Sequence, residues 1–241
     1  MGFRGNFVVD GFTFLASAAL LICLPRLASE NTGTTKKPPT SVRHGLTAMF
    51  RRAPLRESLM LALQTSVGGA FVIVATVDFV KNDLALSDSA YAWVMAAFGI
   101  GSVVGALIYA RVSTGWRDAM VKGSAPVMIA GLIAVAVLPL FSTVTVAWWL
   151  VGMSYSIMGI RGGELLASDS DGDERPHIYA AHFALSHAGW GLTYPLAGWL
   201  STALGFGKTA GIFAVILFLV ACYVWMQSRP GADKLPLSDK T

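Results

Sequence analysis

Charged side chains are scarce in this chain of 241 residues: 13% are Asp, Glu, Lys or Arg, whereas 54% are hydrophobic. Soluble domains carry about 25% charged residues, so a soluble fold would leave much apolar surface in contact with water. Residues 58–77, 91–110 and 209–228 contain no charged side chain at all. A helix needs about 20 apolar residues to cross a bilayer. The composition therefore predicts an all-α integral membrane protein.

Cysteine is also rare, and this excludes several kinds of site. Cys23 and Cys222 lie far apart in apolar segments, which argues against a disulfide framework or a cysteine metal site. The acidic turn at 168–176 begins like a calcium loop, but the sixth and twelfth positions are Glu174 and Ala180, where an EF-hand needs Gly and Glu. No spacing of a nucleophile and a base is present. We expect no cofactor, no metal site and no enzyme.

Seven segments are predicted to cross the membrane. The run 123–160 is free of charge but too long for one helix, and Pro139 marks its break. A signal peptide is the alternative for the first segment, but it would place the following basic loop outside, against the positive-inside rule. The predicted spans are 7–24, 55–80, 89–111, 125–141, 145–166, 177–203 and 208–227.

Lys and Arg are divided unequally by these spans. Fifteen of the 18 fall on one side, and only Arg4, Lys81 and Lys208 fall on the other. Basic loops face the cytoplasm. We therefore expect a multi-pass protein of the plasma (inner) membrane, with its N-terminus outside the cell and its C-terminus in the cytoplasm. The net charge of +4 therefore reflects topology, and we expect the lipid bilayer as a partner and no nucleic acid.

The segment 26–53 is a polar, basic linker between the first two spans. Leu46, Met49, Phe50 and Ala53 recur at the spacing of one helix face. This predicts a short amphipathic helix lying on the anionic inner face of the membrane. A solvated loop is the alternative.

Four strings follow one another in an order that resembles a known family. They are SAALLICLP, LTAMFRRAPLRESLMLALQT, YAWVMAAFGIGSVVGALIYARV and ERPHIYAAHFALSHAGWGLTYPLAGWL. Their succession is similar to helices six, seven, eight and eleven of a major facilitator superfamily (MFS) transporter of the exporter-like branch. Seven spans also occur in retinal proteins, but those need a lysine within the last helix, and Lys208 lies only at its edge.

The resemblance implies the C-terminal half of a twelve-helix permease. Residues 1–25 would be the sixth helix, 26–53 the cytoplasmic linker, 54–228 the six-helix C-terminal bundle and 229–241 a cytoplasmic tail. It implies a proton-coupled antiporter for efflux of a small molecule or metal ion, incomplete without an N-terminal half that supplies the other wall of the cavity. The alternative is a regulatory or interaction subunit that pairs with another membrane protein and transports nothing.

Ionisable groups inside a membrane cost about 2.5–3.5 kcal/mol on insertion scales, so each is a candidate for function. His187 is expected near the midplane of the sixth span, where it could relay protons; His182 lies less deep. About 140° of helix separates them, so they cannot hold one metal ion from one face. Packing histidines are the alternative for both. Asp78, near the outer end of the second span, is a further pathway candidate.

The fifth and sixth spans form a predicted hairpin around the acidic turn. Equal distance from its centre places Arg161 level with His182, and Tyr155 level with His187. Arg161 and Glu164 are three residues apart on a helix and can form an ion pair. This pair is a candidate for a structural lock or for a gate at the cytoplasmic mouth.

Other polar and aromatic residues could line a cavity for an amphipathic or aromatic substrate. The candidates are Gln64 in the second span and Trp190 and Tyr194 in the sixth. Trp148 is expected to anchor a helix at the membrane interface. Gly101 and Gly105 form a Gly-x-x-x-Gly pair of the kind that lets membrane helices approach closely.

Overall fold

The computed structural model describes residues 11–13, 15–17, 19–20 and 42–227. Residues 1–37 and 38–241 form two separate units. The described residues of the first unit are helical, and most of the predicted first span, 7–24, lies outside them. Across both units, the described parts contain helices and turns but no strand, which confirms the all-α class.

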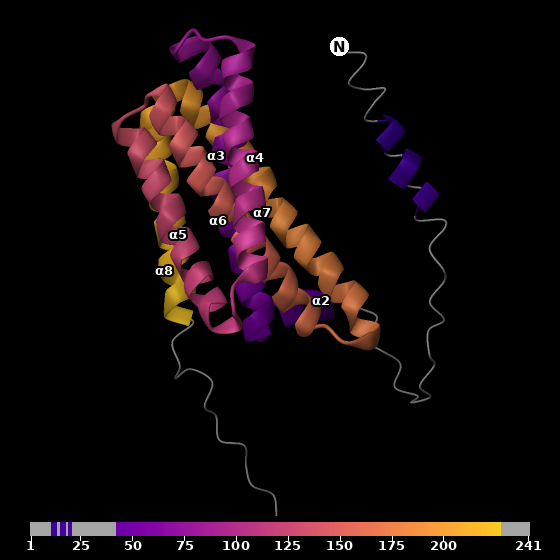
Figure 1. Ribbon diagram of the computed structural model, residues 1–241. Helices are drawn as coiled ribbons and strands as arrows, with labels where there is room; N and C mark the ends of the chain where they lie inside the picture. The colour runs from indigo at the N-terminus through magenta and orange to yellow at the C-terminus, as the bar shows by residue number, and fades with distance from the viewer. Residues whose placement is uncertain (1–10, 14, 18, 21–41, 228–241) are drawn as a thin grey trace, which may run out of the picture. The chain divides into compact units, whose positions relative to one another are not determined.

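The second unit is a bundle of antiparallel helices (Figure 1). Its helices are α2 (Val42–Arg51), α3 (Ala53–Asp78), α4 (Asp88–Arg111), α5 (Thr114–Val137), α6 (Phe141–Ser168), α7 (Arg175–Leu204) and α8 (Phe206–Gln227). Short turns reverse the chain, so α3, α5 and α7 begin at the end of the bundle where α4, α6 and α8 finish. This is called the linker end, because α2 packs there against α3 and α7.

Five described helices are long and apolar enough to cross a membrane: α3 with its π-helical extension η1 (Phe79–Asp83), α4, α5, α6 and α8. Helix α7 has 30 residues but is not among the five. Its three histidines and its hydroxyl side chains dilute the apolar ones. The structure agrees with a multi-pass membrane protein, and the count of seven spans stays a prediction.

The long charge-free run breaks at the predicted place, since α5 ends at Val137 and α6 begins at Phe141. The span predicted at 125–141 falls largely on a helix that begins earlier, at Thr114, and ends at Val137. Arg117 therefore lies on the helix and not in a loop. Charges fit in these first turns because facing helices neutralise them; Asp118, for example, lies 3.3 Å from an arginine of α6.

Glycines allow α4 and α6 to make backbone contact. A Cβ at Gly101 would overlap the carbonyl oxygen of Trp149, and a Cβ at Gly152 would overlap that of Phe98. The backbone of α6 encloses Gly105 in a similar way. The close packing predicted from the Gly-x-x-x-Gly pair is confirmed, and its partner is α6.

Helix α3 is the most enclosed of the five apolar helices, since 67% of its apolar window is buried, against 17–44% for the others. It contacts α6, α7 and α8. Trp148 of α6 is fully buried against it and donates its indole N–H to Thr76 Oγ1 at 2.7 Å. The prediction that Trp148 lies at the membrane interface was wrong, because α3 covers this face and supplies the polar partner that the indole needs.

The predicted amphipathic helix is α2, and much of its apolar face packs on protein. Met49 is fully buried in a cluster that includes Ile178 of α7, whereas Phe50 stays 55% exposed. A Cβ at Gly45 would overlap the backbone of His177, so α2 touches the start of α7. The apolar stripe is therefore shared between the bundle and its surroundings, and is not wholly available to lipid.

The glycine contacts predict different outcomes at neighbouring positions of α4. Gly101→Ala should lower stability by about 1–3 kcal/mol, because its Cβ forces the two backbones apart. Gly99→Ala should be neutral or slightly stabilising, since a Cβ at this position would meet no atom within 4 Å. Thermal denaturation of the detergent-solubilised protein measures both. Equal melting temperatures for the two variants would contradict the close α4–α6 packing.

Candidate functional site

One cluster of polar side chains joins α4, α5 and α6 at the linker end. It comprises Tyr109, Arg117, Asp118, Arg161 and Glu164, and is called the gate cluster after one of the two roles predicted for Arg161 and Glu164. Glu164 accepts hydrogen bonds from the Tyr109 hydroxyl at 2.8 Å and from Arg117 Nη1 at 3.3 Å. Arg161 lies 3.3 Å from Asp118 and 3.8 Å from Glu164. The ion pair expected between Arg161 and Glu164 is therefore present, as part of a larger network.

The gate cluster is electrically balanced, with two arginines facing two carboxylates. The Arg117 guanidinium also lies over the Tyr109 ring, 5.1 Å from its centroid, where a cation is attracted to the ring face. Arg161 lies near both carboxylates and Glu164 lies near both arginines, so the charges of these three helix ends neutralise one another. The network therefore favours one arrangement of three helix ends.

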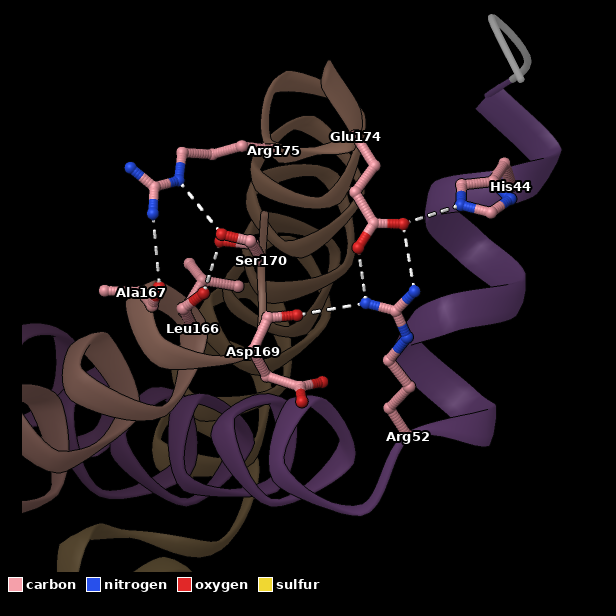
Figure 2. Close-up of polar contacts among 8 residues, drawn as sticks. All are labelled: His44, Arg52, Leu166, Ala167, Asp169, Ser170, Glu174 and Arg175. Atoms are coloured by element: carbon pink, nitrogen blue, oxygen red, sulfur yellow. Dashed lines mark hydrogen bonds and ion pairs between the residues drawn. The ribbon is translucent and has the colours of Figure 1, made fainter. Parts of the chain in front are cut away.

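A second cluster ties the linker to the turn between α6 and α7 (Figure 2). This linker cluster comprises His44, Arg52, Asp169 and Glu174. Arg52 donates to both carboxylate oxygens of Glu174, at 2.6 and 2.9 Å, and to the backbone oxygen of Asp169 at 3.0 Å. His44 Nε2 lies 3.0 Å from the same carboxylate. A bidentate pair of this kind fixes orientation as well as distance.

The contacts of the linker cluster shift the pKa values of Glu174 and Arg52 in opposite directions. The hydrogen bonds from Arg52 and then His44 lower the pKa of Glu174 to about 2. The same hydrogen bond raises the pKa of Arg52. Within the acidic turn at 168–176, Glu174 is therefore held by counter-charges from the linker.

Side chains of the turn also donate hydrogen bonds to backbone carbonyls within the turn and at the end of α6. Ser170 is fully buried and donates its hydroxyl to the Leu166 carbonyl at 2.7 Å. Arg175 donates to the carbonyls of Ser170 and Ala167, at 3.1 and 3.4 Å (Figure 2). These bonds hold the end of α6 and the start of α7 in the position from which Glu174 meets Arg52.

Three of the predicted pathway residues meet in an aromatic cluster. Tyr155 of α6 lies edge-on to Trp190 of α7, with ring centroids 6.5 Å apart, and Trp190 lies 5.1 Å from Tyr194. Phe98 of α4 contacts Tyr155 at 5.6 Å. Gly69 of α3 makes room, since a Cβ there would press into the Trp190 ring. The cluster thus joins four helices.

The two predicted histidines have different surroundings. Ser58 of α3 donates its hydroxyl to the Gly162 carbonyl at 2.8 Å and lies 3.2 Å from His182 Nε2, so this nitrogen is assigned as the donor to Ser58. His187 is exposed on α7. Its ring stacks on Phe183, and its Nδ1 donates to the Phe183 carbonyl at 2.9 Å.

The structure keeps two other candidates away from the aromatic cluster. Gln64 is buried on the face of α3 that lines a cavity with α5 and α8. Asp78 is exposed at the far end of α3, where its carboxylate accepts a hydrogen bond from Asn82. Tyr155, expected level with His187, instead meets Trp190 three residues further along α7.

Sequence reasoning missed Arg117 and Asp118 in the gate cluster and His44 and Arg52 in the linker cluster. The basic residues had been counted only as loop charges. A usable signal was present for the linker, because its arginines and the acidic turn were both predicted on the same side of the membrane. Within the described residues, no group of three or more His, Cys, Asp or Glu is placed to hold a metal ion.

The apolar helices of the bundle match a known protein family. Residues 59–240 fit the family model of the Major Facilitator Superfamily. The match covers more than half of the chain, from the first turns of α3 through the whole of α8.

The low pKa of Glu174 predicts how the linker cluster depends on pH. A carboxylate whose pKa falls from 4.5 to about 2 on folding stabilises the protein above pH 4.5, and this contribution disappears as pH falls toward 2. Glu174→Gln should therefore lower the melting temperature at pH 5–7, with the difference from the parent shrinking below pH 4.5. Asp173→Asn is the control and should have little effect. A constant difference down to pH 2 would exclude the charge as its cause.

Proposed function

Because the chain belongs to the major facilitator superfamily of transporters, we propose that it forms the C-terminal half of an exporter-like permease. In this proposal α3 to α8 form one wall of a central cavity, and six further helices, in the same or another polypeptide, form the other. Such halves are related by an axis along the membrane normal, and substrate binds between them near the midplane. The family match across α3 to α8 carries the proposal.

The proposed reaction is secondary active antiport. Protons enter while a small molecule or metal ion leaves across the plasma (inner) membrane, with the linker end in the cytoplasm. The excess of Lys and Arg predicted on that side supports this orientation.

The aromatic cluster is the proposed substrate contact. Tyr155 and Trp190 are half-buried and Tyr194 is 36% exposed, so all three side chains keep some accessible surface. Aromatic rings with a phenol or indole group combine apolar area with a hydrogen-bonding edge. This chemistry suits an amphipathic or aromatic substrate.

The gate cluster is the proposed cytoplasmic gate. Alternating access moves helices of one repeat relative to those around the site, and this cluster joins three helix ends by ion pairs. In the proposed cycle the pairs of Glu164 hold one state and separate in the other. His187, exposed on α7, is the proposed proton carrier, and His182 positions α7 on α3 through Ser58.

The function is tested with the complete twelve-helix transporter. Cells that produce it are challenged with a panel of metals, siderophores and dyes, and efflux is measured with and without a pH gradient. Gradient-dependent efflux of a panel member supports the proposal. A chain that co-purifies with a membrane partner while moving no substrate would instead identify a regulatory subunit.

The proton role predicts that His187→Ala abolishes pH-driven efflux while membrane expression stays normal. The reason is that the aromatic and gate clusters contain no side chain that ionises near neutral pH in its unperturbed state, whereas a histidine does. His177→Ala, at the start of the same helix, is the control and should retain efflux. Unchanged efflux in His187→Ala would exclude it as the carrier.

The gate role predicts non-additive effects within the cluster. Arg117→Gln and Glu164→Gln should each slow transport severalfold, and the double variant should be no slower than the worse single one, because both remove the same contact. Initial rates of efflux in membrane vesicles measure this cycle. Fully additive losses would show that the two residues act separately.

A further inference from the structure

A cavity of about 270 Å³ lies between α3, α5 and α8 in the half of the bundle nearest the linker end. Each helix turns one face toward it: lining residues recur every three or four positions along α5 and α8, and along α3 as Glu57, Leu61 and Gln64. The aromatic cluster lies on the other side of α3, which contacts α7 through Gly69. The cavity is therefore separate from the proposed substrate contact, and a ligand bound in it does not depend on the proposed function.

The inner part of the cavity holds a buried acceptor without a donor. Gln64 is 2% exposed, and its Oε1 has no hydrogen-bond partner among the described residues. The surrounding wall is mostly apolar, formed here by residues such as Ile129 and Phe218. An orphaned buried acceptor is costly, so an occupant that brings an uncharged donor to this depth would remove that cost.

The mouth of the cavity holds an acid that is not engaged in an ion pair. Glu57 is half-buried and forms no ion pair or hydrogen bond with any residue that the structure describes. It lies seven residues before Gln64, on the same face of α3 and about 10 Å away along the helix axis. An ionisable group at this depth without a partner is a candidate for ligand binding.

The remaining charges at the mouth favour a cation over an anion. Arg161 and then Lys122 act on Glu57 from a distance, but Arg161 is already paired with Asp118 at 3.3 Å, and Asp118 is a second acid in the cavity lining. Among the described residues that line the cavity, Lys122 is the one basic side chain. An anion at Lys122 would face Glu57 and leave Gln64 without a donor, whereas an ammonium at the mouth would pair with Glu57.

We propose that this cavity binds an elongated amphipathic amine that carries a second, uncharged donor. The ammonium group pairs with Glu57 at the mouth, the apolar body lies between α5 and α8, and a hydroxyl or amide N–H at the inner end donates to Gln64. Both donors are needed, because the two acceptors are too far apart for one group to reach.

The chain offers its own reporter for this site. Cys222 of α8 lines the cavity and is partly exposed. The full chain contains one other cysteine, Cys23, so Cys23→Ser leaves Cys222 as the single thiol. Its rate of reaction with N-ethylmaleimide, measured by mass spectrometry in nanodiscs, reports occupancy without any transport assay.

Four probes with the same apolar body separate the contributions: 8-amino-1-octanol, octylamine, 1-octanol and octanoate. The amino alcohol should slow the labelling of Cys222 at the lowest concentration. Glu57→Gln should raise its half-protective concentration about tenfold or more, and Gln64→Leu about threefold, in line with charged and neutral hydrogen bonds. Lys122→Met should leave binding unchanged or tighten it.

Matched comparisons keep the result independent of folding. Asp173→Asn should not alter protection, and the probe series in the parent protein needs no substitution in the cavity. Equal protection by all four probes would overturn the proposal in favour of an unselective slot for lipid chains. Strongest protection by octanoate, or no protection by any probe, would overturn it as well.

Discussion

Helices in a bilayer have no hydrophobic force to press them together, so this bundle depends on how closely its backbones can approach. The seam between α4 and α6 shows the constraint most clearly, because Gly101 and Gly152 leave no room for a side chain. Helix α6 in turn contacts α3 and α5. The seam therefore sets the distance over which Tyr109 reaches Glu164 and over which Phe98 reaches Tyr155. Both clusters would change if the seam widened.

The sequence predicted features that repeat along one helix and missed those that need a second one. The break before Phe141 and the close packing at Gly101 were readable, because a proline or a glycine spacing carries them locally. The start of α5 was not readable. Arg117 interrupts the apolar run of this segment, and its partner Glu164 lies on another helix. The interfacial position predicted for Trp148 was wrong for the same reason. An aromatic residue near a span's end looks interfacial until the hydroxyl that satisfies it, on α3, is seen.

The end of α6 belongs to both polar clusters at once. Glu164 is the centre of the gate cluster, and five residues later the backbone oxygen of Asp169 accepts from Arg52 of the linker. One rigid helix end therefore carries contacts to α4, α5 and the linker. A displacement of the end of α6 that separates Glu164 from Arg117 would also strain the contact between Asp169 and Arg52. Arg52 of the linker would thus be coupled to the proposed gate through the end of α6.

Helix α3 connects the two proposed ligand sites through opposite faces. On one side Gly69 packs closely against the Trp190 ring, and on the other Gln64 faces the cavity with α5 and α8. Because α3 is closely packed against its neighbours, a shift of the helix toward α7 would enlarge the cavity beside α5 and α8, and a shift the other way would reduce it. Ligands on the two faces would therefore alter each other's affinity by the same factor, because coupling between binding sites is reciprocal. The sign depends on whether both ligands favour the same position of α3.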